Sequence, residues 1–461
     1  MTSSPSPAGG PAPSEADVIV VGMGPGGEHL AGTLASRGLT VIGVENRLVG
    51  GECPYWGCIP SKMLIRSANL LAEGCRVEGM AGDVTVAPDF AVPAQRIRDE
   101  ATDGWDDSVA ADRFAGTGGH LLRGEGRLTG PGSIEVDGRA YRARRGIVLN
   151  TGTRPATPPI DGLADTPYWT NREILEAEAL PESLIVIGGG AVGLELAQAF
   201  VRFGTKTTIV EAGPRLLGPE EPESADLLTR VLGGEGITIH TDAGVTRATH
   251  DGTEFTLTFG DEQVRAERLL VATGRIPNTD RIGLDSIGVD PGSSVRVDEH
   301  QRLADGVWAI GDITGKGAFT HVSMYQADIA IRSILGEDGP GADYRALPRV
   351  TFTDPEVGAV GLTERQAREA GLTVRTGTAD LAASSRGFIH KAGNDGLVKL
   401  VEDADRGVLV GATAAGPSGG EVLGALVVAV RAQVPVADLR HTIYAYPTFH
   451  RAIESALADL S

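Results

Sequence analysis

Two stretches of this chain repeat one pattern of apolar and polar positions. In each, a short apolar run leads into three glycines with the spacing GxGxxG, then into a helix-like segment and a second apolar run that ends in a glutamate. Compact apolar runs bounded by turn residues are typical of buried strands. The expected strand, helix and strand are 17–21, 28–36 and 40–44 in the first stretch, and 184–187, 194–203 and 207–210 in the second.

The glycines and the glutamate of each stretch indicate a dinucleotide site. Glycines let the backbone approach a pyrophosphate at the start of a helix, and an acid at the end of the second strand binds a ribose hydroxyl. Two copies predict two dinucleotides that exchange electrons; the alternative is that one copy is a degenerate, purely structural fold. The residues are Gly22, Gly24, Gly27 and Glu45 in the first copy, and Gly188, Gly190, Gly193 and Glu211 in the second.

Three further apolar runs end in short turns. We interpret the first two turns as crossings between domains. Asp312, in the third, is either a ligand for a polar part of a cofactor or a helix N-cap. The turns are Thr151-Gly152, Thr273-Gly274-Arg275 and Gly311-Asp312.

The pattern changes from about residue 344. Strand-like and helix-like segments follow there without a glycine-rich phosphate loop, which predicts an α+β domain. The expected strands are 350–352, 397–401 and 408–412, and the expected helices are 364–370 and 420–432.

Composition and charge limit the function classes. A chain of 461 residues is long enough for roughly two to four domains. A net charge of -20 argues against a nucleic-acid or anionic-membrane partner, because both need a basic surface. Residues 1–15 predict a disordered tail rather than a signal peptide, and we expect a cytoplasmic protein. The acidic runs 99–107 and 219–226 are expected to be solvated.

Two of the three cysteines, Cys53 and Cys58, lie close together in the chain. A long chain with so few cysteines does not need disulfides for stability, so redox chemistry is one interpretation of the pair. The alternatives are two unrelated buried thiols or half of a zinc site, although no second cysteine pair is present to complete such a site. Cys75 is expected to be a plain helix or core thiol.

Together these motifs resemble the class I pyridine nucleotide–disulfide oxidoreductases, which include dihydrolipoamide dehydrogenase, glutathione reductase and mercuric reductase. The segment 50–62, with Gly51, both cysteines and Lys62, matches the redox-active disulfide motif of that family. The resemblance implies an α/β fold with two Rossmann-like dinucleotide-binding domains and a C-terminal α+β dimerisation domain. The implied division is a tail 1–15, an FAD-binding domain 16–153 and 278–345, an NAD(P)-binding domain 154–277 and a dimerisation domain 346–461.

The resemblance also implies cofactors and roles. FAD would bind at the first GxGxxG and at the three turns, and NAD(P)H at the second GxGxxG. Cys58 would be the thiolate nearest the flavin, and Cys53 the thiol that exchanges with substrate. Lys62 would pair with Glu195 near the flavin; the alternative is a surface lysine and a mid-helix glutamate. Glu211 favours NADH over NADPH, because an acid there binds a ribose diol and repels a 2′-phosphate; Arg215 is close enough to soften this preference.

The resemblance fails at one place. In the family's reductases a C-terminal His-Pro-Thr-x-x-Glu, supplied by the partner subunit of a homodimer, holds the acid/base pair. Tyr446 here replaces the histidine and Arg451 the glutamate. A tyrosine titrates near ~10 and a histidine near ~6.5, so Tyr446 is a better proton donor than base. Arg451 would bind an anionic substrate or stabilise a thiolate, and His450 is either a replacement base or a packing or interface residue.

We therefore predict an FAD- and NAD(P)H-dependent oxidoreductase that passes electrons through Cys53 and Cys58 to a disulfide or another sulfur or electrophilic substrate. Two other functions remain as alternatives. One is carbon–sulfur cleavage with carboxylation, because ketopropyl-coenzyme M oxidoreductase/carboxylase is a relative that also lacks the histidine–glutamate pair. The other is a flavin-bound redox sensor without turnover.

Overall fold

The computed structural model describes residues 12–292 and 294–461. None of the helices in this part of the chain combines the length and apolarity that crossing a bilayer requires. The expected tail, 1–15, lies outside the described residues as far as residue 11, and Glu15 already belongs to the first strand. The described backbone forms two compact units, one of residues 12–60, 97–155 and 275–343, the other of residues 61–96, 156–274 and 344–461.

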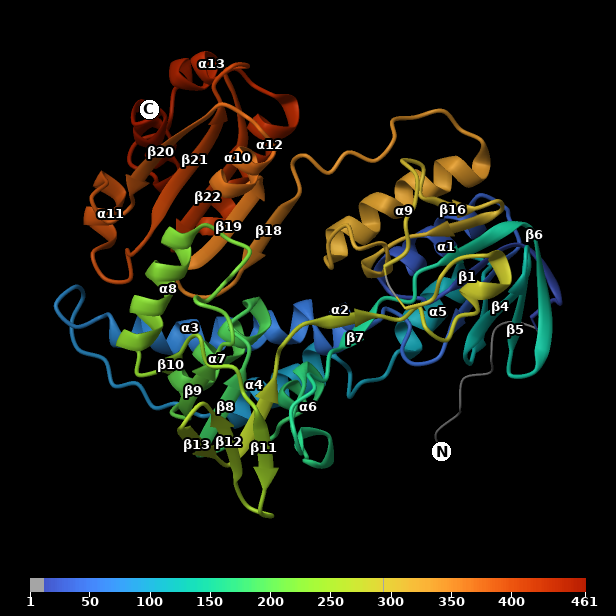
Figure 1. Ribbon diagram of the computed structural model, residues 1–461, viewed down its shortest axis with the longest axis horizontal. Coiled ribbons are helices and arrows are strands. Elements are labelled where there is room, and N and C mark those ends of the chain that lie inside the picture. Colours follow the sequence, from blue (N-terminus) through green and yellow to red (C-terminus); the bar gives the residue numbers. More distant parts are fainter. Residues whose placement is uncertain (1–11, 293) are drawn as a thin grey trace. The chain divides into compact units, whose positions relative to one another are not determined.

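The first unit is built on a sheet with the strand order β16-β17-β6-β1-β2-β3. β1 (Glu15–Val21) lies between β2 (Val41–Glu45) and β6 (Arg139–Leu149) and is parallel to both. α1 (Pro25–Ser36) and α9 (Thr320–Leu335) share a buried core with one face of this sheet (Figure 1). The other elements are α2 (Glu52–Trp56), α5 (Ser108–Gly116), β3 (His120–Arg123), β4 (Gly126–Gly130), β5 (Ser133–Val136), β7 (Thr153–Pro155), β15 (Arg275–Pro277), β16 (Arg302–Ala304) and β17 (Val307–Ala309).

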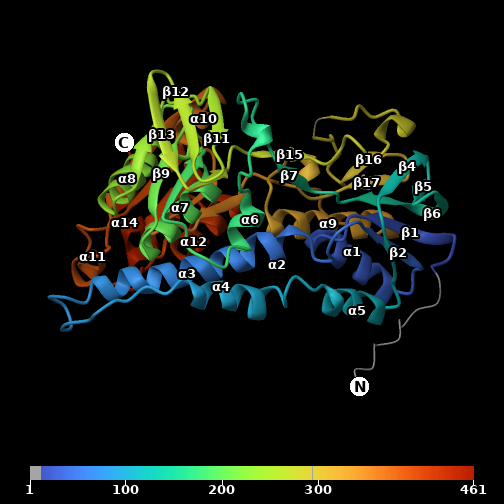
Figure 2. The same ribbon diagram turned by 90° about the horizontal axis from the view of Figure 1, so that it is seen from below.

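The second unit contains the repeat of this plan. β8 (Ser183–Ile187) lies between β9 (Lys206–Val210) and β14 (Arg268–Val271), parallel to both, and α7 (Ala191–Phe203) follows β8. The antiparallel strands β11, β12 and β13 share a core of buried side chains with these strands. Figure 2 shows the ribbons of β11, β12 and β13 next to β9. The further elements are α3 (Cys58–Cys75), α4 (Ala91–Arg96), α6 (Asn171–Leu175), α8 (Pro222–Gly234), β10 (Thr238–His240), β11 (Arg247–His250), β12 (Phe255–Phe259) and β13 (Glu262–Ala266).

The helix after each glycine turn begins three residues earlier than the sequence predicts, at Pro25 and at Ala191. Pro25 occupies the first helical position, where a missing N–H costs nothing because that group has no partner inside the helix. The glycines that follow are therefore part of the first helical turn. This places the start of each helix, with its unpaired N–H groups, at the middle glycine of the motif.

The C-terminal part of the second unit is an antiparallel sheet with helices, as expected for an α+β domain. Its strand order is β18-β19-β22-β21-β20, and α12 and α14 pack their apolar residues into its core. The elements are β18 (Pro348–Thr351), β19 (Glu356–Gly361), α10 (Glu364–Glu369), β20 (Val374–Asp380), α11 (Ser385–His390), β21 (Leu397–Asp403), β22 (Val408–Gly416), α12 (Gly419–Ala432), α13 (Val436–His441) and α14 (Ala452–Ala458).

The acidic runs are not simply solvated, so that expectation is wrong. Asp107 is buried and accepts a hydrogen bond of 2.5 Å from the Val49 N–H. Glu221 is 3% exposed and pairs with Lys399. A charged side chain is buried when a partner compensates for its lost hydration, and the sequence pattern does not reveal a partner so distant in the chain.

Candidate functional site: two nucleotide turns and a cysteine pair

The first glycine turn is closed tightly by its own neighbours. Gly22 has a φ of 94°, and a Cβ there would lie 2.3 Å from the backbone oxygen of Asn150. A Cβ at Gly27 would lie 2.1 Å from the backbone oxygen of Gly22. The Asn150 amide donates a hydrogen bond of 3.1 Å to that same oxygen. The turn thus requires glycine at both ends, and it presents the start of α1, capped at Gly24, to an anionic ligand.

Glu45 lies against this turn from the end of β2. Its Oε2 accepts a hydrogen bond of 2.8 Å from the Met23 N–H, and its Oε1 accepts one of 2.8 Å from the Arg47 N–H. Burial raises the pKa of the Glu45 carboxyl, and these two backbone donors oppose the rise. Each carboxylate oxygen keeps a lone pair, so the group remains able to accept a hydrogen bond from a ribose hydroxyl.

The second glycine turn is built in the same way. A Cβ at Gly188 would lie 2.4 Å from a backbone oxygen at the end of β14, and one at Gly193 would lie 2.3 Å from the Gly188 oxygen. Glu211 Oε2 accepts a hydrogen bond of 2.6 Å from the Gly189 N–H, and its Oε1 accepts one of 2.6 Å from the Gly213 N–H. Both predicted nucleotide motifs therefore have the close glycine contacts and the positioned acid that binding requires.

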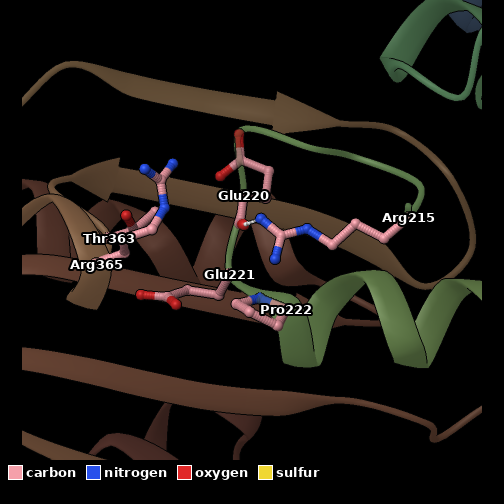
Figure 3. Close-up of a pocket in the computed structure, with 6 residues that line it drawn as sticks. All are labelled: Arg215, Glu220, Glu221, Pro222, Thr363 and Arg365. Atoms are coloured by element: carbon pink, nitrogen blue, oxygen red, sulfur yellow. Dashed lines mark hydrogen bonds between the residues drawn. The ribbon is translucent and has the colours of Figure 1, made fainter. Parts of the chain in front are cut away.

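An open hollow of about 350 Å³ adjoins the second turn. Gly190 caps α7 there, and apart from its chain neighbours and the backbone of α7, no heavy atom of the described residues lies within 4 Å of a Cβ built on it. Arg215 reaches this hollow, but its Nη2 donates to the carbonyl oxygens of Gly218, at 2.6 Å, and Glu220, at 3.0 Å. Figure 3 shows the Arg215 guanidinium beside the Glu220 main chain, with the Glu220 carboxylate pointing the opposite way. The hollow is lined by Gly189, Gly190, Glu211, Gly213, Pro214, Arg215, Gly218 and Pro219.

The cysteine-bearing segment is attached to the first glycine turn. The Gly50 N–H donates a hydrogen bond of 2.7 Å to the backbone oxygen of Met23. Gly51 has a φ of 69°, and a Cβ there would lie 2.8 Å from the Gly24 Cα. Glycine at position 51 therefore allows α2 to begin directly beside the cap of α1.

Tyr55, between the two cysteines, fixes this segment to the first unit. It is 5% exposed, its hydroxyl donates to the backbone oxygen of Val49 at 3.1 Å, and its own backbone oxygen accepts from the Trp105 ring N–H at 3.3 Å. Burial raises the pKa of Tyr55 to about 12. Tyr55 is therefore a packing residue that remains protonated at neutral pH.

The side chains of Cys53 and Cys58 lie within hydrogen-bonding distance of each other. Cys53 is half-buried on α2, and Cys58 is exposed at the start of α3. The Cys58 Sγ lies 3.4 Å from the Oγ1 of Thr320, the first residue of α9. A hydrogen bond with the Cys58 thiol and burial raise the pKa of the Cys53 thiol, and the Thr320 hydroxyl opposes this. The start of α9 beside Cys58 favours a thiolate there. Cys75 ends α3 and is exposed, not in the core.

Asp312 is half-buried and belongs to a series of polar contacts. Its Oδ2 accepts a hydrogen bond of 2.9 Å from the Thr153 hydroxyl, which accepts one of 2.6 Å from the Arg275 Nε. Arg275 Nη2 also lies 3.3 Å from Glu52 Oε2, next to Cys53 in the chain. Burial raises the pKa of the Asp312 carboxyl. Gly311, not Asp312, caps the short helix here, so the N-cap interpretation of Asp312 is wrong.

The turns that we interpreted as crossings hold short backbone contacts. Thr151 Oγ1 donates to the backbone oxygen of Asn278 at 2.8 Å, and the Asn278 N–H donates to the Gly152 oxygen at 2.9 Å. The Ala156 N–H donates to the Gly274 oxygen at 2.9 Å. β7 and β15, which follow these turns, pair with each other in antiparallel fashion. Hydrogen bonds to backbone oxygens therefore hold these turns in place. Among the residues of the turns, Arg275 has a side chain that reaches the cysteine segment, at Glu52.

Lys62 and Glu195 form the expected ion pair, at 2.8 Å. Glu195 is 6% exposed on α7, and its Oε1 accepts a hydrogen bond of 2.8 Å from the Phe352 N–H. The Lys62 Nζ lies 4.8 Å from the centre of the Phe352 ring. The alternative of a surface lysine and an unrelated glutamate is wrong, because both oxygens of Glu195 have positioned donors.

The C-terminal segment brings Tyr446 and Arg451 together. Tyr446 is 69% exposed, and the Arg451 guanidinium carbon lies 5.6 Å from the centre of its ring. Arg451 also donates to the backbone oxygen of Tyr444 at 3.3 Å and pairs with Glu454 at 2.8 Å. The His450 ring lies 6.3 Å from the Tyr444 ring, which is a packing contact. The segment therefore offers an exposed phenol with a cation over its ring.

Two family models match nearly the whole chain. The model of the pyridine nucleotide-disulphide oxidoreductases covers residues 16–327, and the model of their dimerisation domain covers residues 347–457. The chain belongs to the pyridine nucleotide-disulphide oxidoreductases. It is an α/β oxidoreductase of a family whose members use FAD and NAD(P)H.

Relatives within this family are named for different activities. The chain is 34% identical to a dihydrolipoyl dehydrogenase of Thermus scotoductus, over 96% of this chain and 97% of that one. It is 33% identical to a mercuric reductase of Streptomyces lividans, over 95% of each. The Cu(II) complex of the HOCl-induced flavoprotein disulfide reductase RclA from Escherichia coli has a TM-score of 0.84 and 27% identity, over 96% of this chain and 99% of that one.

Sequence reasoning missed some residues that the structure places at these sites. Thr320 contacts Cys58, Thr153 joins Asp312 to Arg275, and Asn150 closes the first turn. Asn150 and Thr153 lie on either side of the Thr151-Gly152 turn, and Thr320 is the first residue of α9. A short polar residue in such a position is ordinary turn chemistry, so no signal in the sequence distinguishes it.

Proposed function

We propose that this pyridine nucleotide-disulphide oxidoreductase passes electrons from NAD(P)H through FAD to Cys53 and Cys58, and from them to a disulfide or another sulfur or electrophilic substrate. The observation that supports this most is the attachment of the cysteine segment to the first glycine turn through Gly50 and Gly51. It places a thiol pair beside a turn whose shape suits a dinucleotide.

The first turn fits FAD. Gly22 and Gly27 leave no room for a side chain, Gly24 caps α1, and Glu45 offers acceptor oxygens at the end of β2. Asp312, half-buried and accepting a hydrogen bond from the Thr153 hydroxyl, is the proposed contact for a further polar part of the cofactor. FAD bound there supplies two-electron transfer between a nicotinamide and a disulfide.

Thiol–disulfide exchange by the cysteine pair accounts for the proposed reduction of a disulfide. The Cys53 thiolate attacks one sulfur of the substrate, and the other sulfur leaves as a thiolate. The Cys58 thiolate then attacks the Cys53 Sγ, which releases the second substrate sulfur and forms the Cys53–Cys58 disulfide. The substrate gains two electrons and the cysteine pair loses two. Thr320 and the start of α9 stabilise the Cys58 thiolate. Lys62, held by Glu195, is the proposed cation near the flavin.

Proton supply is where this chain departs from its relatives. Each substrate thiolate that leaves takes up a proton. We propose that Tyr446 donates this proton. In the proposed homodimer, the C-terminal segment of each protomer completes the active site of its partner. A neutral phenol carries a proton that it can donate to a thiolate, and it has no basic nitrogen with which to accept one. Arg451, with its guanidinium over the Tyr446 ring, adds positive charge that suits an anionic substrate or a thiolate. We assign His450 to packing.

We further propose that NADH is preferred over NADPH at the second turn. Glu211 is fixed by two backbone N–H groups beside the hollow, where its charge binds a ribose diol and repels a 2′-phosphate. Arg215 would counter this preference, but both of its contacts at Nη2 are to backbone carbonyls of its own loop.

A substrate screen tests this function. Purified wild type with NADH is offered a series of low-molecular-weight disulfides, and cofactor oxidation is followed. We expect sustained turnover with at least one disulfide, its loss in Cys58→Ser and its retention in the matched variant Cys75→Ser. Flavin that NADH reduces once, with no turnover on any acceptor, would instead support a sensor. Thiol release from a thioether, with uptake of labelled bicarbonate, would instead support carbon–sulfur cleavage.

A further inference from the structure

The loop between β9 and α8, residues 211–221, connects the nucleotide hollow to the C-terminal sheet. Its first part lines the hollow, as described above. In its middle, the Leu217 N–H donates a hydrogen bond of 2.9 Å to the backbone oxygen of Gly189, in the second glycine turn. Leu217 is 3% exposed and has a φ of 44°, so its neighbours hold it in an unusual backbone conformation. The position of this loop therefore depends on contacts outside it.

Those contacts come from the C-terminal sheet. Arg349, on β18, donates from Nε to Glu220 Oε1 at 2.6 Å and from Nη2 to Glu220 Oε2 at 2.8 Å. Arg349 Nη1 also donates to the backbone oxygen of Gly361 at 3.4 Å, at the end of β19. The side chains of Glu220 and Arg349 are 11% and 21% exposed. A bidentate pair with this little exposure fixes both distance and orientation.

The next residue is fixed as well. Glu221 accepts a hydrogen bond of 3.1 Å from the Lys399 Nζ, on β21, and one of 2.7 Å from the Glu364 N–H. Lys399 is itself buried. A cavity of only about 50 Å³ remains under the loop at this point (Figure 3). Thus the end of the loop is held by the sheet, whereas its start is held by the glycine turn.

Glu220 contacts both Arg349 and Arg215. Its carboxylate binds Arg349, and its backbone oxygen accepts the hydrogen bond from Arg215. We propose that Arg349, acting through Glu220, is a positioning residue that sets the preference for NADH over NADPH by keeping the Arg215 guanidinium on its own loop. Without the Arg349 contact, the Glu220 carbonyl is no longer fixed, and Arg215 turns into the hollow, where its charge attracts a 2′-phosphate. This inference rests on the proposed binding of NAD(P)H at the second turn.

The test compares kcat/KM for NADH and NADPH in wild type, Arg349→Met and Glu220→Gln. We expect each variant to shift the ratio toward NADPH by roughly fivefold or more, mainly through KM for NADPH. Adding Arg215→Ala to Arg349→Met is expected to abolish the shift, and Arg349→Lys to restore part of the preference. Arg247→Met is the matched control, because Arg247, on β11, forms an exposed pair with Asp161 and is not among the residues that line the cavity under the loop. In this control variant, the ratio of kcat/KM for NADH to kcat/KM for NADPH is expected to equal that of wild type.

Flavin content and melting temperature separate a specific effect from misfolding. Glu220→Gln keeps the side-chain volume, so it remains informative if Arg349→Met folds poorly. A folded variant that uses NADH with an unchanged nucleotide ratio would overturn the inference and leave the proposed function standing. A shift that persists after Arg215→Ala would also overturn it. A wild type whose flavin neither nucleotide reduces would contradict the proposed function itself.

Discussion

The two glycine turns share one backbone plan and differ in what surrounds them. In both, the third glycine packs on the carbonyl of the first, and a glutamate binds the N–H of the residue after the first glycine. The first turn is closed by the Asn150 side chain and by the segment that carries the cysteines. At the second turn, Ala272 occupies the place of Asn150, and Gly190 caps α7 beside an open hollow.

The closed first turn suits a cofactor that stays bound, and the open second turn suits one that exchanges. A closed turn with a buried glutamate favours a dinucleotide that stays bound, since both the ligand and the carboxylate are removed from water. An open hollow with a more exposed glutamate favours a nucleotide that binds and leaves at each turnover. The proposed assignment of FAD to the first turn and NAD(P)H to the second follows this difference. Four variants follow in order of expected effect, and the first two test this assignment.

The largest effect is expected from replacing the third glycine of each turn. Gly27→Ala places a Cβ against the Gly22 oxygen, and Gly193→Ala places one against the Gly188 oxygen. Overpacking of this kind costs about 1–3 kcal/mol, which corresponds to roughly 5–150-fold in affinity if the nucleotide must bear that cost. We expect Gly27→Ala to lose flavin on purification and Gly193→Ala to keep flavin but to raise KM for NADH. Absorbance spectra and steady-state kinetics measure both; flavin loss in Gly193→Ala would reverse the assignment.

A smaller effect is expected at the C-terminal segment. The double variant Tyr446→His, Arg451→Glu restores the residue types that the family's reductases use for acid/base work. General acid–base groups contribute about 10²–10⁴-fold, so even partial function is expected to raise dithiol–disulfide turnover by about tenfold. The pH profile of turnover is measured beside it. If turnover does not rise in a folded, flavin-containing double variant, the substrate pocket sets the limit and the missing pair does not.

The smallest effect is expected from Thr320→Val. The Thr320 hydroxyl opposes the rise in the pKa of the Cys53 thiol, so its removal raises that pKa further. A thiol with a raised pKa reacts faster as the pH rises toward that pKa, because the thiolate is the nucleophile. In the reduced protein we expect alkylation of Cys53 by iodoacetamide to slow by roughly three- to tenfold at fixed pH. Cys75 is the internal control in the peptide analysis; equal rates for Cys53 in both proteins would contradict the role of Thr320.

These comparisons also show what the sequence could predict. The strands and glycine turns are local patterns, so their positions followed from residues close together in the chain. The helix starts were misplaced by three residues because glycines in a first helical turn look like loop. Partners distant in the chain, such as Arg349 for Glu220 or Thr320 for Cys58, were not predictable, since their contacts exist only after folding. The Lys62–Glu195 pair was found because a family motif, rather than local chemistry, pointed to it.

The central claim is that electrons from NADH reach the Cys53–Cys58 pair through a flavin at the first turn. An anaerobic titration of the flavin-loaded protein with NADH, followed by absorbance, tests it directly. We expect wild type to develop a long-wavelength band from a thiolate beside the flavin, and Cys58→Ser to lose this band while its flavin is still reduced. A wild type whose reduced form lacks the band, or a Cys58→Ser protein that keeps it, would contradict the account.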